Sequence, residues 1–432
     1  MKITFVRPNM AAARAADAMQ PLSIAVLSGL TPDEIEKEFY DECVEEIPTD
    51  IETGLVAISA HTFSALRAYR IAEGFRRRGI PVVLGGYHPS ACPREALRHA
   101  DSVVVGPAEG VWQKVVADAR AGRLAKIYRS KEPLSLSGVR YDRTIFKGKK
   151  YTPLFPVEFG RGCRFRCEFC SVSAFHGHTH AVRAIEDVME DVRAADPRRV
   201  LFVDDNIFSN RALARRLFDA LEGARVQWGC QISIDVAGDT SLLERMARGG
   251  CRMVLIGFES LVDENLRQMK KGSHCSAADY RRAIERLRDH GMMIYGSFVF
   301  GYDADSKDIF ARTVEFALEH RFALANFNTL NPMPGTRLHQ RLRAEGRLLE
   351  ERWWLDEKYR YGEVMFVPKL LSPAELKAGC IWARREFFRY SSIARRLLDP
   401  RANSRSLGHA GLFLVANLVA RRECMAKMRR IQ

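Results

Sequence analysis

Short apolar runs alternate with longer polar stretches of helical periodicity along most of the chain. In the first part, four runs rich in β-branched residues predict buried strands: Ile3–Val6, Gly54–Ser59, Pro81–Leu84 and Ser102–Val105. Helix-length segments separate these runs, which is typical of βαβ units and a parallel sheet. Gly85-Gly86 and Gly106-Pro107 follow the third and fourth runs. We therefore expect turns at the carboxyl ends of strands, the edge at which open α/β sheets bind ligands.

A second alternating series begins after an irregular segment. Residues 128–155 lack periodicity and contain Pro133 and Gly138, which predicts a linker between domains. Six apolar runs follow the linker: Val157–Phe159, Val200–Val203, Trp228–Ile234, Arg252–Gly257, Met293–Phe300 and Leu324–Leu330. Helical patterns such as Arg183–Ala194 and Ala277–His290 lie between them. Six strands interleaved with helices favour a (βα)₆ partial barrel. A second open parallel sheet is the alternative, because periodicity does not distinguish the two.

The pattern becomes mainly helical after Pro334-Gly335. Five aromatic residues of this last region are expected to pack in a core: Trp353, Trp354, Trp382, Phe387 and Phe388. The chain is thus predicted to be an α/β protein of four parts. These are a Rossmann-like parallel-sheet domain over residues 1–127, the linker over 128–155, the partial TIM barrel over 156–335, and a basic helical region over 336–432.

The positive charge is concentrated near the C-terminus. The whole chain has a net charge of +14, and residues 381–432 contribute +9 of it, from twelve basic and three acidic side chains. A solvated helical tail is one interpretation, and peripheral contact with an anionic membrane surface or an acidic partner is the other. Leu and Val separate these charges, so they form no aromatic-rich basic stripe, and no nucleic-acid partner is expected.

The N-terminal residues form a predicted strand and do not resemble a signal peptide, so a cytoplasmic location is expected. The longest late apolar stretch, Leu412–Ala420, is interrupted by Asn417. It falls short of the roughly 20 residues that span a bilayer. A transmembrane anchor is therefore not expected.

Three of the ten cysteines, Cys163, Cys167 and Cys170, are closely spaced. In a reducing compartment such a group favours a metal site over disulfides. The group directly follows the first predicted barrel strand, at the edge where barrels form active sites. Three thiolates on one loop can bind three irons of a [4Fe–4S] cubane and leave the fourth iron open. A structural zinc site is the alternative, with a fourth ligand from one of three histidines: His176, His178 or His180.

The C-x₃-C-x₂-C spacing, with Phe169 before the last cysteine, resembles the signature of the radical S-adenosylmethionine (SAM) superfamily. The resemblance implies that SAM chelates the open iron and that one electron cleaves a sulfur–carbon bond of SAM, usually giving a 5′-deoxyadenosyl radical. It also implies an external one-electron reductant of the flavodoxin or ferredoxin type. Residues implied in the SAM site are Phe169, Asp204, Asp205, Gln231, Ser233, Glu259, Ser260, Phe300 and Gly301.

Most of these residues also have a structural interpretation. Asp204-Asp205-Asn206 would cap a helix equally well, and Glu259 could pair with a neighbouring arginine. Gln231 and Ser233 could form polar pairs in the core, and the glycines around Phe300 could serve a turn. No catalytic side chain is identified by the sequence.

The order of a Rossmann-like domain, a linker, a cysteine-bearing barrel and a helical tail resembles the radical SAM subfamily with an N-terminal cobalamin-binding domain. Three segments support the resemblance: Leu84–Pro89, Val103–Glu109 and Pro332–Thr336. It implies cobalamin between the two domains, with Gly85, Gly86 and His88 as contacts. The Asp-x-His-x-x-Gly motif of some cobalamin domains is absent, so a bound cobalamin is expected to lack a histidine lower ligand. His61 is a further candidate contact, and a structural role is the alternative for both histidines.

These observations favour a cobalamin-dependent radical methyltransferase of small-molecule or lipid biosynthesis. The alternative is a cobalamin-independent radical transferase, for 3-amino-3-carboxypropyl or adenosyl groups, or a rearrangement enzyme with a vestigial cobalamin domain. A non-enzymatic iron–sulfur or zinc protein is a third class. The seven dispersed cysteines are expected to be dispensable for cluster assembly, and Cys275 and Cys424 are the candidates for an auxiliary site. The sequence does not identify the substrate.

Overall fold

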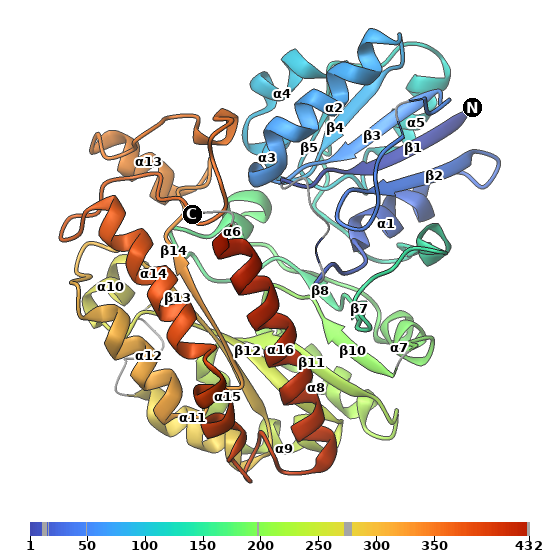
Figure 1. The fold of residues 1–432 in the computed structure, drawn as a ribbon. Coiled ribbons are helices and arrows are strands. Elements are labelled where there is room, and N and C mark those ends of the chain that lie inside the picture. Colours follow the sequence, from blue (N-terminus) through green and yellow to red (C-terminus); the bar gives the residue numbers. More distant parts are fainter. Residues whose placement is uncertain (11–14, 16, 49, 197, 272–278, 430–432) are drawn as a thin grey trace.

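Two parallel sheets, each surrounded by helices, form the body of the protein (Figure 1). The computed structural model describes residues 1–10, 15, 17–48, 50–196, 198–271 and 279–429. In Figure 1 the N-terminal domain, drawn in blue, lies against one end of the barrel. Helix α3 (Tyr87–Ala91) of that domain packs on helix α6 (Ser171–His176) of the barrel. The predicted α/β class is confirmed.

The N-terminal sheet has the strand order β2-β1-β3-β4-β5-β6, and all of its pairings are parallel. Four strands correspond to the predicted runs: β1 (Lys2–Arg7), β3 (Leu55–Ser59), β4 (Val82–Gly85) and β5 (Ser102–Val105). The helices that cover the two faces are α1 (Leu22–Leu30), α2 (Ala65–Arg77), α3, α4 (Pro93–His99) and α5 (Trp112–Arg120). Burial on both faces explains why these four strands are continuous apolar runs.

Two edge strands were not predicted, β2 (Glu36–Asp41) and β6 (Ile127–Arg129). β2 has the sequence EKEFYD and β6 has only three residues. Edge strands are commonly short or charged, because such residues discourage pairing with other chains. The predicted domain boundary at residue 127 falls within β6. The linker also contains a short helix, η2 (Arg143–Phe146), whose Phe146 is buried in the N-terminal core.

The second sheet is the predicted six-stranded arc, in the order β14-β13-β12-β11-β10-β7, again with parallel pairings throughout. Its strands are β7 (Phe155–Val157), β10 (Arg199–Phe202), β11 (Gln227–Ile232), β12 (Cys251–Glu259), β13 (Met293–Phe300) and β14 (Leu324–Thr329). The outer helices are α7 (Ile185–Arg193), α8 (Arg211–Leu221), α9 (Thr240–Arg248), α10 (Asp263–Gln268), α11 (Tyr280–Asp289) and α12 (Ile309–Glu319). The first residues of the predicted helix at 277–290 lie outside the described ranges. Since β7 and β14 are the two ends of the strand order, the arc is a partial barrel.

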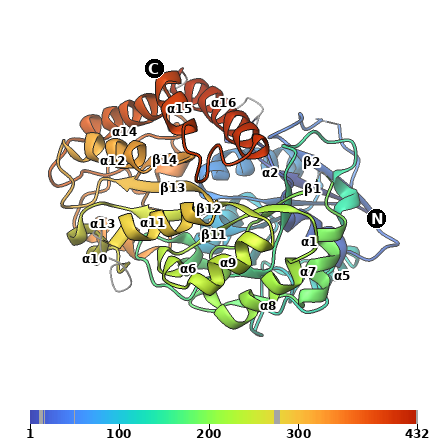
Figure 2. The same ribbon diagram turned by 90° about the horizontal axis from the view of Figure 1, so that it is seen from below.

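The C-terminal region is helical, with α13 (Arg337–Ala344), α14 (Pro373–Phe387), α15 (Tyr390–Leu397) and α16 (Leu407–Arg429). Figure 2 shows α14, α15 and α16 along one side of the barrel, next to α12 and β14. Of the aromatics expected in a core, Trp353 and Trp354 are buried in the N-terminal domain, and Phe387 and Phe388 in the barrel. Trp382 differs, because its side chain is 43% exposed. Within the described ranges, none of the helices combines the length and hydropathy needed to cross a membrane.

Candidate active site

The cysteine loop, residues 163–170, lies between β8 (Gly160–Arg161), a short strand that follows β7, and α6. Two carboxylates at the end of the neighbouring strand β10 hold the backbone that enters it. Asp204 accepts a hydrogen bond from the N–H of Gly160 (2.5 Å), and Asp205 accepts one from the N–H of Gly162 (2.9 Å). Gly162 has a φ of 95°, and a Cβ there would lie 2.2 Å from a carbonyl oxygen. A side chain at position 162 would therefore collide with the backbone, so the entry to the loop requires glycine there.

Sequence reasoning placed Asp204 and Asp205 at SAM, and the structure gives both a supporting role. Asp204 is 2% exposed, and this burial raises the pKa of its carboxyl well above the usual value. Burial also raises the pKa of Asp205, against the opposing effect of its bond from Gly162. The helix-capping alternative applies to Asn206, whose side chain accepts the N–H of Phe208 at the start of η3 (Ile207–Ser209).

Cys163, Cys167 and Cys170 are free and partly exposed. Among the described residues, no group of three or more His, Cys, Asp or Glu side chains is arranged to hold a single metal ion. A zinc site requires such convergence on one point. In a cubane, by contrast, each thiolate binds a different iron, so the ligands surround a larger volume.

Burial raises the pKa of the Cys167 thiol to about 12 and also raises that of Cys170. A metal ligand must be a thiolate, so binding of iron would release protons here. The Lys271 ammonium opposes the effect of burial on Cys167. The site thus contains three thiols and one cation that favours their ionised form.

Lys271 is a site residue for which the sequence gave no signal. Its Nζ donates to the Glu259 carboxylate over 2.8 Å. Although burial acts to lower it, Glu259 and the thiols of Cys167 and Cys170 raise the pKa of Lys271. Glu259 ends β12 with a φ of 64°, so it occupies the predicted strand end. The structural alternative predicted from the sequence was an ion pair with an arginine, whereas in the structure Glu259 pairs with Lys271.

Three of the predicted SAM-site residues are accessible. Gln231 is exposed on β11, and Ser233 follows that strand and accepts a hydrogen bond from Asn206 over 3.4 Å. Phe169 is partly buried, with its ring centroid 6.5 Å from that of Tyr302. These side chains remain available to a ligand at the carboxyl end of the barrel.

The other three predicted SAM-site residues serve the core. Ser260 is buried and accepts the N–H of Val262 over 3.1 Å. Phe300 is 2% exposed and packs among other buried rings. Gly301 has a φ of 111°, and a Cβ there would lie 2.7 Å from the side chain of Leu376. Ser260, Phe300 and Gly301 thus pack against neighbouring residues, and their place in the SAM site stays a prediction.

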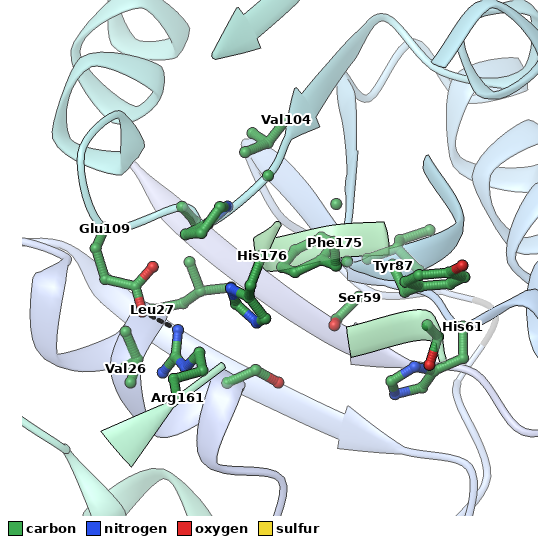
Figure 3. A pocket seen from close by; sticks show the side chains of 18 of the residues that line it. Val26, Leu27, Ser59, His61, Tyr87, Val104, Glu109, Arg161, Phe175 and His176 are labelled. Atoms are coloured by element: carbon green, nitrogen blue, oxygen red, sulfur yellow. Dashed lines mark hydrogen bonds and ion pairs between the residues drawn. The ribbon is translucent and has the colours of Figure 1, made fainter. Parts of the chain in front are cut away.

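A cavity of about 540 Å³ lies between the N-terminal domain and the barrel (Figure 3). Its N-terminal wall is made by the turns after β3, β4 and β5, including Gly85, Gly86 and Gly106. Gly86 has a φ of 97°, and a Cβ there would lie 2.8 Å from the carbonyl oxygen of Ala60. Gly106 has a φ of 84°, and a Cβ there would meet no atom within 4 Å. Glycine at 106 therefore leaves open space at the cavity wall.

Part of the lining of this cavity is apolar. The residues that line it come from α1, α5 and three central strands: Val26, Leu27, Ala57, Val83, Val104 and Trp112. The opposite wall belongs to the barrel and includes the start of α6, which begins directly after Cys170. Phe175 and His176 of that helix reach into the space shown in Figure 3.

An ion-pair bridge crosses the cavity wall from one domain to the other. Arg161, two residues before Cys163, contacts Glu109 of the N-terminal domain (2.5 Å) and Glu158 of the barrel (2.8 Å). Burial acts to raise the pKa of Glu158, but the pairing with Arg161 lowers it overall. The sequence gave no signal for the contact between Arg161 and Glu109, because these two residues become neighbours only through the fold.

The two candidate histidines have different surroundings. His88 is fully buried in the N-terminal domain, where its Nε2 lies 3.0 Å from the Tyr69 hydroxyl and 3.2 Å from Glu95. It is not among the cavity-lining residues, and its role as a cobalamin contact stays a prediction. His61 lines the cavity (Figure 3), and desolvation of its imidazole there lowers its pKa.

Comparison with known proteins identifies the family. Residues 157–317 match the family model described as the Radical SAM superfamily. The chain is 30% identical over 390 residues to bacteriochlorophyllide d C-12(1)-methyltransferase of Chlorobaculum tepidum, across 87% of this chain and 84% of that protein. The chain belongs to the radical SAM superfamily. Bacteriochlorophyllide d C-8(2)-methyltransferase of the same organism is 31% identical over 380 residues, across 81% and 83% of the two chains. Radical SAM enzymes use a [4Fe–4S] cluster and SAM, in agreement with the predicted cofactors.

Two solved structures share the fold of this radical SAM enzyme. TsrM, a radical SAM methyltransferase from Kitasatospora setae, is 17% identical with a TM-score of 0.67, over 90% of this chain and 84% of that one. OxsB, a cobalamin-dependent SAM radical enzyme, is 12% identical with a TM-score of 0.66, over 98% and 72%. The likeness extends over both domains, so the arrangement of an N-terminal sheet domain on a partial barrel is common to all three.

Proposed function

We propose that the protein is a cobalamin-dependent radical SAM methyltransferase. In this proposal the cysteine loop holds the [4Fe–4S] cluster, and the cavity between the domains holds cobalamin. The observation that carries the proposal is the shared wall: α6, which starts directly after Cys170, lines the same cavity as the glycine turns of the N-terminal domain. A methyl carrier in this cavity would lie beside the element that carries the cluster.

The cavity fits a cobalamin in two respects. Gly106 leaves open space at the cavity wall for a broad, flat ring system, and Gly85 and Gly86 line the cavity at the carboxyl end of a parallel strand. The apolar residues that line the cavity suit an aromatic group such as the nucleotide base of cobalamin. The relatives named as methyltransferases, at 30% and 31% identity, support the same group transfer.

When bound, the cluster would supply the electron that cleaves SAM, and cobalamin would supply a carrier for the methyl group. The chain itself provides position and charge. Asp204 and Asp205 fix the backbone that enters the cysteine loop. The Arg161 bridge to Glu109 joins that loop to the N-terminal wall. Lys271 places a positive charge near the thiols.

The proposed substrate is an apolar small molecule or lipid, and the proposed electron donor is a flavodoxin or ferredoxin. The named relatives support this substrate class, since two act on bacteriochlorophyllide d. A third, at 23% identity over 77% of this chain, is the hopanoid C-2 methylase of Rhodopseudomonas palustris. The substrate is thus proposed only as a class.

Product analysis tests the proposal. The anaerobically reconstituted protein is incubated with SAM, a one-electron reductant and candidate substrates, with and without hydroxocobalamin. Cobalamin-dependent S-adenosylhomocysteine supports methyl transfer. Methylthioadenosine formed without cobalamin would instead indicate aminocarboxypropyl transfer, and 5′-deoxyadenosine alone would indicate hydrogen abstraction or rearrangement. Either of these results contradicts the proposal.

A further inference from the structure

Helix α16 is apolar on two opposite sides. On the barrel side, Phe413 is fully buried, and Asn417 donates to the carbonyl oxygen of Ala323 over 3.0 Å. The outward side carries large apolar residues that are 94%, 38%, 62%, 50% and 39% exposed: Leu407, Leu414, Val415, Leu418 and Val419. A surface helix normally presents polar residues to water. Within the described chain, nothing buries this outward stripe.

The outward residues form continuous rows, because side chains three and four positions apart are neighbours on a helix. Two rows run side by side and each ends in an arginine: Leu414, Leu418 and Arg421, then Val415, Val419 and Arg422. The Arg421 guanidinium lies 4.2 Å from the ring centroid of Tyr390. Tyr390 is 65% exposed, so an amphipathic aromatic stands beside the first row. We call Tyr390 and the five outward residues of α16 the C-terminal apolar face.

The charges of the region that carries this face are mainly positive. Residues 381–432 carry twelve basic and three acidic side chains. Arg405 precedes α16 and Arg422 lies near its end, and both are exposed. Glu423, the acidic residue of α16, lines a small cavity with residues of β14. An occupant of the face therefore has to accept apolar contact and supply negative charge.

We propose that the C-terminal apolar face binds the surface of an anionic lipid bilayer. The opposite side of α16 is packed on the barrel, so only the outward side can enter the lipid, and the helix lies along the interface. Its 23 residues extend over about 34 Å. The apolar rows enter the boundary between headgroups and acyl chains, Tyr390 lies at headgroup level, and the arginines contact phosphates. A second copy of the chain fits the face less well, because it would bring more positive charge to it.

The inference does not depend on which group the active site transfers. A lipid-bound enzyme would meet apolar substrates at the surface where they dissolve. Binding to lipid can be measured without cluster, SAM or cobalamin, so its failure is distinct from failure of the proposed function.

The test uses the full-length protein and vesicles of phosphatidylcholine with or without phosphatidylglycerol. We expect the wild type to float with the anionic vesicles, and binding to weaken as salt is added. Leu414→Ser/Leu418→Ser should reduce binding at least about tenfold, because two apolar side chains no longer enter the lipid. Arg405→Gln/Arg422→Gln should lower binding to the anionic vesicles and reduce its dependence on salt. The matched control is Leu349→Ser/Leu370→Ser, which changes leucines that are 53% and 59% exposed outside the face.

Circular dichroism and thermal melting establish whether each variant folds. If Leu414→Ser/Leu418→Ser does not fold, Arg405→Gln/Arg422→Gln still tests the face. The proposal is overturned if the wild-type protein stays in the dense bottom fraction of the gradient and does not float with the anionic vesicles. It is also overturned if the control loses as much binding as the Leu414→Ser/Leu418→Ser variant. If the protein forms dimers in the absence of lipid and Leu418→Ser dissociates them, a second copy of the chain covers the face. That result would also overturn the proposal.

Discussion

Gly106→Leu should separate the cavity from the stability of the domain that forms it. Gly106 has a φ of 84°, and a Cβ there would meet no atom within 4 Å, although the residue lines the cavity between the domains. A leucine side chain would therefore project into space that the proposal assigns to cobalamin. Gly122, at the end of α5, has a φ of 65° and equally open surroundings, but it does not line the cavity. Gly122→Leu is thus a control with a similar backbone cost.

Two effects of the substitution can be weighed against each other. A non-glycine residue in the left-handed region costs about 1–2 kcal/mol, and this applies to both variants. Crowding a fitted site with extra methylene groups costs a further 1–3 kcal/mol or so, and this applies only to Gly106→Leu with cobalamin bound. At about 1.4 kcal/mol per tenfold change, cobalamin should bind roughly ten- to a hundredfold more weakly to Gly106→Leu. Binding to Gly122→Leu should equal that of the wild type.

The assay measures cobalt retained after incubation with hydroxocobalamin and gel filtration, together with chemical unfolding of both variants. We expect similar losses of stability and different retention of cobalt. Equal retention in Gly106→Leu and the wild type, with a folded protein, would show that the ring does not lie against residue 106. Equal loss in both variants would show that retention reports only the stability of the N-terminal domain.

Three further predictions concern single groups. Replacing all three cysteines of the cysteine loop by Ala should abolish cluster absorbance and SAM cleavage, whereas Cys424→Ser should keep its full iron content by colorimetric assay; a full cluster in the triple variant contradicts the ligand assignment. Bound Co(II) cobalamin should show no splitting from a histidine nitrogen in its electron paramagnetic resonance spectrum, and His61→Ala should leave that spectrum unchanged. A nitrogen splitting that is present in the wild type and lost in His61→Ala would contradict the expected absence of a histidine ligand. Arg396 is fully buried and donates to the carbonyl oxygens of Phe322, Ala323 and Phe387, so Arg396→Met should lower the free energy of unfolding by about 3 kcal/mol in denaturant titrations; a loss no larger than that of the exposed Arg395→Met would refute this.

The sequence predicted the strands that are buried on both faces, because such burial favours a continuous run of apolar residues along an extended backbone. β3, β4 and β5 are covered on both faces, so most of their residues are apolar, and the buried centre of β1 includes Ile3, Phe5 and Val6. β2 carries Glu36, Lys37 and Glu38, and its position at the sheet edge is a property of the assembled sheet. Such a strand gives no hydrophobic signal, so its absence from the prediction has a physical cause.

The active site divides in the same way. The three cysteines are close in sequence because one loop carries them, so their spacing indicated the chemistry before the structure was known. Arg161 and Glu109 are 52 positions apart, and their pairing depends on how the two domains meet. Lys271 likewise reaches the thiols only through the path of β12 and α10. Spacing can therefore indicate a ligand loop, but it gives no information about the charges that surround it.

The two histidines show why residue type and local context were insufficient at the cavity. His61 and His88 both come shortly after a buried strand; His61 precedes the short helix η1 (Thr62–Ser64), and His88 lies in the first turn of α3. The partners of His88 include Glu95 on α4 and Tyr69 on α2, and the Nε1 of Trp354 donates to the same Glu95 carboxylate over 2.9 Å. These partners, one of them from the C-terminal region, hold His88 inside the domain. His61 lines the cavity, so if a histidine did contact a bound cobalamin, substitution at 61 would alter the cobalamin spectrum, whereas substitution at 88 in a folded variant would leave it unchanged.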